Sequence, residues 1–283
     1  MLVVSAEYNR GAGLGNKLFP WARTRILAQE KGCAFLNTRW VSPHGGGISR
    51  GGVDYRRALR KIVLVGNFKP DCGALSSWAY WLKGRRLPVV RCATLSEARA
   101  IDGDVHVVFR WDAEHNFSEF AGRQKFLRHV LRNMTVSSQQ SFIDRWIGRD
   151  YIALNVRCGN DFIPAGSLSL GYVKTGIEWF AAALKTVRMK YGNLPAVVVS
   201  DGGAKQLQQL LRLEDVRLLD APSAIADLGV MMGARVLLGS GNSTFSAWAS
   251  FLGEMDTYSS AATPFRYAGL EDGRNGEKIV GIL

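Results

Sequence analysis

The segment Val236-Leu-Leu-Gly-Ser-Gly-Asn-Ser-Thr-Phe-Ser-Ala-Trp248 is the most informative part of the chain. A short apolar run ends in a loop of small and polar residues, and Phe245 and Leu252 then lie on one helical face. The helix is therefore expected to begin near Ser243 or Thr244. Its free N–H groups and two hydroxyls would point at one place, which suits an anionic oxygen such as that of a phosphate. An ordinary Ser/Thr N-cap explains the same residues, and this segment alone does not decide between the two.

The composition describes a folded protein with room for two domains. The chain has 283 residues, of which 47% are hydrophobic and 21% charged, values typical of globular rather than disordered proteins. It contains no apolar run of about 18 residues, so no membrane-spanning helix is expected. The first residues, Leu2-Val3-Val4, indicate a core strand rather than a secretory leader, which favours a cytoplasmic location.

The cysteines and histidines predict neither disulfides nor a metal site. Cys33, Cys72, Cys92 and Cys158 are widely separated and form no CxxC motif, so they are expected to be free thiols in a reducing compartment. The four histidines show no ligand spacing either. No cofactor and no metal are predicted.

The formal net charge of +12 favours a polyanionic partner. Nucleic acid, anionic lipid and a polyphosphate ligand all fit this charge, as does a basic face that serves only solubility. No RNP motif, zinc finger or basic zipper is present, so nucleic acid is not favoured. Trp40, Trp78, Trp81 and Trp111 would suit sugar stacking or a membrane interface, but core positions are the favoured interpretation.

Strand-like and helix-like segments alternate, which predicts parallel sheets flanked by helices. Expected strands are 2–5, 34–36, 62–65, 105–109, 151–156, 196–200, 216–219 and 236–238. Expected helices are one that carries Leu18, Phe19, Ala22 and Ile26 on one face with Pro20 in its first turn, then 117–133, 137–148, 174–191, 203–211, 223–233 and the one after Ser243. The region 38–60 is expected to be a loop. Residues 134–150 are the expected join between two Rossmann-like halves.

Four loops follow candidate strands directly: residues 7–16, 157–161, 200–203 and 239–244. Ligands of parallel α/β sheets bind outside the carboxyl ends of the strands. If the two halves face each other, these four loops converge on one cleft.

The first of these loops contains Gly11-Ala-Gly-Leu-Gly-Asn16. Its glycines would allow a ligand to approach the backbone, while Asn16 would cap the helix and offer an amide. We reject a dinucleotide-binding fingerprint, because Asn16 replaces the third glycine and no acidic residue follows a second strand about 20 residues later. The alternative that this loop is a glycine-rich turn with a purely structural role stays open.

Charged residues follow two further strands. Arg157 comes after a buried strand, where its guanidinium would clamp a pyrophosphate, although an Arg–Asp pair that fixes the loop is the alternative. Asp201 would bind a ribose hydroxyl or a base edge, or would simply cap the next helix. Asp102-Gly-Asp104 imitates a metal-binding Asp-x-Asp motif but is predicted to be a turn.

Together these motifs resemble one family over residues 11–253, the α-1,2-fucosyltransferases of glycosyltransferase family 11. Gly13-Leu-Gly-Asn-Lys-Leu-Phe19 is similar to the family signature Gly-Gly-Leu-Gly-Asn-Gln-Leu/Met-Phe. Val156-Arg-Cys-Gly159, followed by an acid, is similar to His-x-Arg-Arg-Gly-Asp. The stretch from Asp227-Leu228 to Trp248 resembles the block Asp-Leu…Met…Asn-Ser-Thr-Phe-Ser-Trp-Trp. The family's first histidine is Asn155 here, its second arginine is Cys158, and the first tryptophan of its last pair is Ala247.

The resemblance implies a GT-B-like α/β fold, in which two Rossmann-like domains with parallel sheets face a central cleft. Residues 1–140 would form the acceptor-side domain and 141–283 the nucleotide-sugar-binding domain, with the tail 264–283 packing back on the first. The implied enzyme is an inverting, metal-independent glycosyltransferase that uses a nucleotide-diphosphate sugar, with GDP-fucose favoured. Its acceptor would be a glycan or lipid-linked glycan in surface polysaccharide or lipopolysaccharide synthesis, reached in the cytoplasm or from the inner face of an anionic membrane.

The resemblance also implies site residues. Arg157 would hold the diphosphate, Asn16 would lie near the sugar or acceptor, and Asp161 is the first candidate for the general base, ahead of Glu7 and His44. The full donor-binding set is Gly13, Gly15, Asn16, Arg157, Asp201, Asp227, Asn242, Ser243, Thr244 and Phe245. Two alternatives remain open: the same fold with a UDP- or dTDP-sugar (hexose or furanose), and a non-catalytic module that binds nucleotide sugars or nucleic acid.

Overall fold

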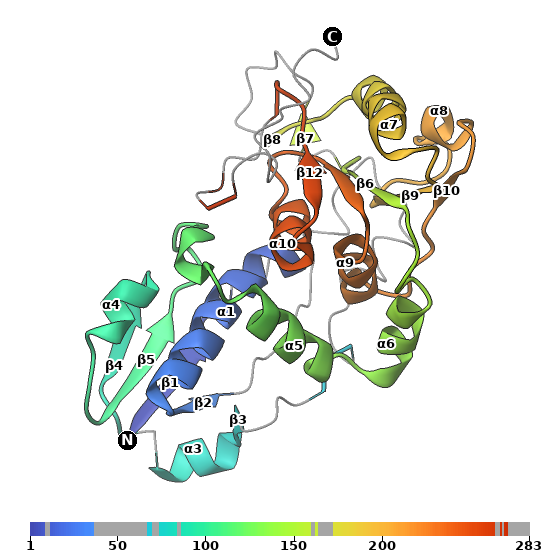
Figure 1. The fold of residues 1–283 in the computed structure, drawn as a ribbon. Coiled ribbons are helices and arrows are strands. Elements are labelled where there is room, and N and C mark those ends of the chain that lie inside the picture. The colour runs from blue at the N-terminus through green and yellow to red at the C-terminus, as the bar shows by residue number, and fades with distance from the viewer. Residues whose placement is uncertain are drawn as a thin grey trace.

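The protein folds into two parallel β-sheets with helices between and around them (Figure 1). A computed structural model describes residues 1–8, 12–36, 67–69, 74–83, 86–159, 162–163, 172–263, 267 and 269–270. The expected strand 62–65, the expected loop 38–60 and most of the tail 264–283 lie outside these residues. No helix in the described ranges is long and apolar enough to cross a membrane.

The first sheet is built from the first half of the chain. Its strands are β1 (Leu2–Ala6), β2 (Ala34–Leu36), β3 (Ala74–Leu75), β4 (Val89–Cys92) and β5 (Val105–Phe109). They run parallel in the order β3-β2-β1-β5-β4. Successive residues alternate between the two faces, and Val4, Val107 and Phe109 join the main hydrophobic core on one of them.

The second sheet comes from the second half of the chain. Its strands are β6 (Ile152–Val156), β9 (Ala196–Ser200), β10 (Val216–Leu218), β11 (Val236–Gly239) and β12 (Asp256–Tyr258). All are parallel, in the order β10-β9-β6-β11-β12. Strands β9 and β10 are added on one side of β6, and the later strands β11 and β12 are added on its other side. The strand order therefore reverses between β6 and β11. Two short strands, β7 (Phe162–Ile163) and β8 (Tyr172–Val173), pair separately.

Helices cover both faces of the second sheet. In the described residues the α-helices are α1 (Leu14–Lys31), α3 (Ser77–Lys83), α4 (Leu95–Arg99), α5 (Gln124–Met134), α6 (Ser137–Asp144), α7 (Ile177–Tyr191), α8 (Gln208–Leu211), α9 (Ala224–Met232) and α10 (Thr244–Gly253). Apolar residues of α7 share one core cluster with Ile152, Leu154 and Val156. Residues of α9 and α10 join the main core instead, so these helices cover the opposite face.

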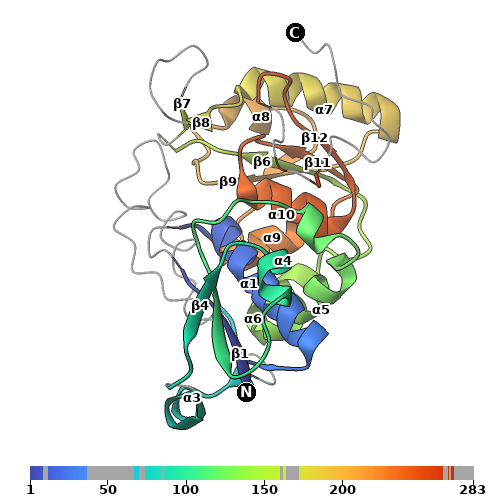
Figure 2. The same cartoon turned by 90° about the vertical axis from the view of Figure 1, so that its left-hand side faces the viewer.

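The two halves share one hydrophobic core, because α10 packs on α1 between the sheets (Figure 2). An aromatic cluster fills the contact. The Trp248 ring of α10 lies 5.0 Å from that of Phe19 in α1, and Phe117 and Phe120 pack on both. This buried apolar surface stabilises the arrangement of the two sheets.

The first helix begins earlier than its sequence predicts. Gly13 is its N-cap, with no side-chain cap, so Asn16 lies inside the first turn and does not cap the helix as expected. Pro20 consequently falls in the second turn, and its predicted place in the first was wrong. Asn16 and Pro20 are four residues apart, so the missing proline N–H leaves the Asn16 carbonyl without its usual helical donor.

Several other boundaries differ from expectation. The expected helix 117–133 is divided into a 3₁₀ turn, η1 (Ser118–Phe120), and α5, because Gly122 between them has φ of +74°. The expected helix 203–211 shortens to α8. The join at 134–150 is largely helical: α6 crosses the predicted division between residues 140 and 141 and packs against α9. That division stays a prediction.

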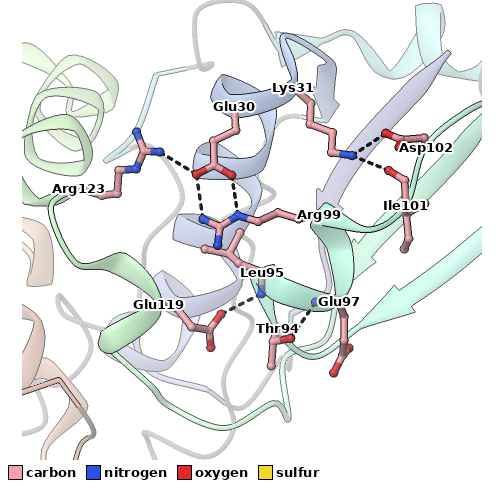
Figure 3. Close-up of polar contacts among 10 residues, drawn as sticks. All are labelled: Glu30, Lys31, Thr94, Leu95, Glu97, Arg99, Ile101, Asp102, Glu119 and Arg123. Atoms are coloured by element: carbon pink, nitrogen blue, oxygen red, sulfur yellow. Dashed lines mark hydrogen bonds and ion pairs between the residues drawn. The ribbon is translucent and has the colours of Figure 1, made fainter.

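Ion pairs fasten α4 and the start of α5 to the end of α1 (Figure 3). The Glu30 carboxylate accepts two 2.9 Å hydrogen bonds from Arg99 and one of 2.7 Å from Arg123. The Arg99 contact holds the pKa of Glu30 below its ordinary value. Below Glu30 in Figure 3, Glu119 accepts the Leu95 N–H at 2.9 Å, and it also pairs with the buried Arg23.

Candidate functional site

The loops after β6 and β11 are joined to each other at the carboxyl edge of the second sheet. Gly239 pairs with Asn155 in the sheet, and the next residue, Ser240, donates its N–H to the Asn155 carbonyl at 3.1 Å. Its hydroxyl donates to the same carbonyl at 2.9 Å and accepts the Arg157 N–H at 3.2 Å. This is where the strand order reverses, the position at which open α/β sheets bind their ligands.

Arg157 is held at this edge by Asp201, which follows the neighbouring strand β9. Its guanidinium lies 3.3 Å from one Asp201 oxygen, and the other oxygen accepts the Cys158 N–H at 2.7 Å. The Arg157 side chain stays 22% exposed, so it is anchored yet reaches the surface of the site. The ion pair that was the alternative for Arg157 is therefore present. The helix-cap alternative for Asp201 is wrong, because the cap of α8 is Leu207.

Cys158 is the next residue of this loop, and its side chain is almost fully buried. Burial raises the pKa of its thiol. A Cβ atom built on Gly202 would lie 2.5 Å from the Cys158 sulfur, so these two residues fit together only because position 202 has no side chain. Cys158 stands at the sequence position where the family motif has its second arginine.

Two buried polar residues that sequence reasoning missed fix α10 to the sheet. The Asn155 side-chain oxygen accepts the Ser246 hydroxyl at 2.7 Å, and both residues are buried. The sequence contained one indication of this contact: Asn155 lies within the apolar strand Ile152–Val156, and a buried amide requires a hydrogen-bond partner. Asn155, which stands in the place of the family's histidine, therefore holds α10 on β6.

The first turn of α10 lies directly against the first turn of α1. Ser243 is the N-cap of α10 and accepts the Ser246 N–H at 3.4 Å, as the ordinary capping interpretation expected. The Thr244 hydroxyl donates to the Asn16 side-chain oxygen at 2.6 Å. A Cβ on Gly15 would lie 2.6 Å from the Thr244 hydroxyl and 2.7 Å from the Phe245 nitrogen. Gly15 therefore permits the close approach of the two helices.

These contacts bring together the described parts of the four loops that were expected to converge. Residues 15–16 contact Thr244, Ser240 contacts the Arg157 loop, and Asp201 contacts the same loop from β9. Neither α1 nor α10 has an acid in its first turn. The positive ends of the two helix dipoles meet at the contact between Asn16 and Thr244, four residues along the chain from Ser240, which contacts the Arg157 loop. This arrangement favours an anion.

The remaining expected site residues have different surroundings. Asp227 is fully buried in the first turn of α9, and Asn242 is half-buried in the loop before α10. A Cβ on Gly13 would meet nothing within 4 Å. Glu7 lies 3.8 Å from Arg91. Asp161 and His44 lie outside the described residues.

No metal centre is present among the residues that the structure describes, which contain no group of three or more potential ligands from His, Cys, Asp and Glu. Asp102 pairs with Lys31 at 2.6 Å and Asp104 pairs with the N-terminal amine, both at the edge of the first sheet where β5 begins. Gly103 between them has φ of +91°, so this segment is a turn as predicted. Cys33, Cys92 and Cys158 are free thiols as expected, and Cys72 lies outside the described part.

Two parallel-sheet α/β domains, with an anion-favouring edge at the point where the strand order reverses, form a GT-B-like fold. The family model of glycosyltransferase family 11 matches residues 114–268, more than half of the chain. The chain therefore belongs to glycosyltransferase family 11. No curated protein matches it.

Solved fucosyltransferases are similar to the chain over most of its length. The fucosyltransferase NodZ from Bradyrhizobium is 16% identical, with a TM-score of 0.50 over 89% of this chain and 93% of that one. NodZ α-1,6-fucosyltransferase soaked with GDP-fucose is 14% identical (TM-score 0.49, 93% and 96% covered). FUT1 from Arabidopsis thaliana, in complex with GDP, is 12% identical (TM-score 0.49, 93% and 72% covered).

Proposed function

We propose that this glycosyltransferase moves a sugar, with fucose favoured, from GDP-fucose to a hydroxyl of a glycan acceptor, with inversion and without a metal. The observation that carries the proposal is the Arg157 loop at the reversal point of the second sheet, bonded to Ser240 three residues before the N-cap of α10. Family membership supports the reaction class. Similar structures are named as complexes with GDP or soaked with GDP-fucose, which supports this donor.

The reaction places negative charge on the leaving nucleotide. The acceptor oxygen forms a bond to the anomeric carbon while the bond from that carbon to the phosphate oxygen breaks, and the nucleoside diphosphate leaves with the electron pair. The Arg157 guanidinium and the N–H groups at the start of α10 stabilise this charge. Ser243, Thr244 and the Phe245 amide are the groups proposed for the terminal phosphate, and Asp161 is proposed to take the acceptor proton.

The contacts refine two of the expected roles. Asp201 was expected at the nucleoside, but both of its oxygens engage the Arg157–Cys158 loop. We therefore assign it as a positioning residue for Arg157. Asn16 was expected near the sugar or acceptor, and through Thr244 it also fixes the first sheet's loop on the helix that holds the phosphate.

The acceptor is proposed to be a glycan or lipid-linked glycan of surface polysaccharide or lipopolysaccharide synthesis, met at the inner face of the cytoplasmic membrane. A second candidate is the same fold with a UDP- or dTDP-sugar. A non-catalytic role is not favoured, because the chain belongs to an enzyme family.

A donor panel tests the proposal. The purified protein is incubated with GDP-fucose, UDP-galactose or dTDP-rhamnose, with and without EDTA, and release of the nucleoside diphosphate is measured. The expected result is turnover of GDP-fucose that EDTA does not reduce. Turnover of only the UDP- or dTDP-sugar would contradict the donor, and loss of activity in EDTA would contradict metal independence.

A further inference from the structure

Helix α3 exposes large apolar side chains, although its tryptophans were expected in the core. Trp78 is 70% exposed, Trp81 53% and Leu82 49%. Their spacing of three and four residues places them on one helical face. Contiguous exposed apolar side chains of this size are uncommon in proteins without a binding partner and mark interaction sites.

The opposite face of α3 is anchored to the first sheet. The Tyr80 hydroxyl contacts the His106 Nδ1 atom of β5 at 2.7 Å, and the two rings lie edge to face 5.1 Å apart. The other ring nitrogen contacts the Ser5 hydroxyl of β1 at 2.8 Å. Burial lowers the pKa of His106, which keeps the ring neutral at this contact. The tryptophan face of α3 is thus presented to solvent by a defined attachment.

The edge strand β4 extends the exposed apolar area. Val89 pairs with His106 in parallel register, so its side chain lies on the same face of the sheet as the residue that holds α3. Val89 is 50% exposed. Both views place α3 beside the start of β4, at the end of the molecule far from α10 (Figures 1 and 2). We define Trp78, Trp81, Leu82 and Val89 as the α3 surface.

The sequence that contains the α3 surface is positively charged. Residues 72–96 contain four cations (Lys83, Arg85, Arg86 and Arg91) and no acid. Arg86 is exposed, whereas Arg91 is exposed but lies 3.8 Å from the Glu7 carboxylate. Asp102 and Asp104, which precede β5 at the edge of the sheet where β4 also begins, pair with Lys31 and the N-terminal amine. A second copy of this chain would set two such positive segments against each other, which disfavours self-association.

We propose that the α3 surface binds the anionic face of a lipid bilayer, with Trp78 and Trp81 at the level of the headgroups and Arg86 on the lipid phosphates. Tryptophan is enriched at this depth because its ring is apolar and its N–H is polar. Cations beside inserted apolar residues add attraction to anionic lipids. The proposal concerns a surface remote from the donor site and does not depend on which sugar is transferred.

Vesicle co-sedimentation tests the proposal. The full chain is mixed with vesicles of phosphatidylcholine alone, or with phosphatidylglycerol added, and the bound fraction is measured. Binding is expected only with the anionic vesicles and is expected to fall as salt increases. The Trp78→Ser/Trp81→Ser variant and the Arg86→Glu variant should each bind roughly tenfold more weakly. Met189→Ser is the control, because it removes a side chain that is 73% exposed on α7 of the other sheet.

Circular dichroism and melting temperature should be unchanged in all three variants, because the substituted side chains are exposed. Three results would overturn the proposal: equal binding to neutral vesicles, retention of vesicle binding by the double tryptophan variant, or a change of that variant from dimer to monomer in light scattering. The last would assign the α3 surface to contact between copies of the chain.

Discussion

The Thr244 hydroxyl donates a 2.6 Å hydrogen bond to the Asn16 side chain, joining residues 228 positions apart at the first turns of α10 and α1. The contact lies at the candidate site, where a helix from each half of the chain begins. Because each helix belongs to a different half of the chain, this contact fixes how the glycine-rich loop lies over the proposed phosphate-binding turn.

A double-mutant cycle measures that contact. Asn16→Ala and Thr244→Val should each destabilise the protein, and their effects should couple by about 1 kcal/mol because one hydrogen bond is lost in either case. Urea unfolding of the two single variants and the double variant provides the free energies. Strictly additive effects would contradict the contact.

Gly15 and Gly13 provide a matched comparison of close packing. A Cβ on Gly15 would lie within 2.8 Å of the backbone of Thr244 and Phe245, whereas one on Gly13 meets nothing within 4 Å. Gly15→Ala should therefore cost about 1–3 kcal/mol of stability, because α1 and α10 must separate. Gly13→Ala should leave the melting temperature unchanged. Equal melting temperatures for both variants would show that the helices are not in contact.

The two residues of the Arg157–Asp201 pair should differ in their effect on turnover. Arg157→Ala removes a donor to the leaving group and should lower kcat by roughly a hundredfold or more. Asp201→Asn should lower it less, because asparagine still accepts the Cys158 N–H at the same place. Steady-state kinetics with GDP-fucose measures both. A larger loss from Asp201→Asn than from Arg157→Ala would contradict the positioning role of Asp201.

The buried pair of Arg23 and Glu119 should matter far more for stability than an exposed pair. Their side chains are 1% and 12% exposed, so Glu119→Ala leaves a buried guanidinium without its carboxylate and should cost about 3–5 kcal/mol. Asp112→Ala, which removes the partner of the exposed Arg110, should have no measurable effect. Chemical unfolding compares the two variants, and similar losses would contradict this account.

Lys17 should make stability depend on alkaline pH. The side chain is 1% exposed, its ammonium has no hydrogen-bond partner among the described residues, and burial lowers its pKa. The unfolded chain then binds more protons than the folded one between the folded pKa and the ordinary value of about 10.4, so stability rises with pH across that window. Lys17→Met should abolish this rise and increase the melting temperature at neutral pH. Melting curves collected between neutral pH and pH 10 measure it; an unchanged slope in the variant would contradict the role of Lys17.

The sequence was sufficient to predict most of the second half of the fold. Strands such as Ala196–Ser200 and Val236–Gly239 are short apolar runs bounded by glycine and polar residues, and the start of α10 at Thr244 follows from its serine cap. In the first half, β4 and α3 were missed, because their apolar residues are exposed and show no pattern of burial. The start of α1 was misplaced because glycine rather than a polar side chain caps it.

The site was predictable to the level of loops but not of contacts. Parallel strands bring their carboxyl ends together, so the convergence of the loops that contain Asn16, Arg157, Asp201 and Thr244 followed from topology. The pairing of Asp201 with Arg157, and of Thr244 with Asn16, depends on how the chain packs in three dimensions. The close approach at Gly15 was anticipated for a ligand, and the structure uses it for α10.

Calorimetric titration of GDP into three proteins tests the central claim most directly: the unaltered chain, Arg157→Ala, and Arg235→Ala. Arg235 is a matched control because it precedes β11 at the opposite edge of the same sheet and pairs with Asp150. GDP should bind the unaltered chain and Arg235→Ala equally and should bind Arg157→Ala at least about tenfold more weakly. Unchanged affinity of Arg157→Ala for GDP would contradict the assignment of this edge as the donor site.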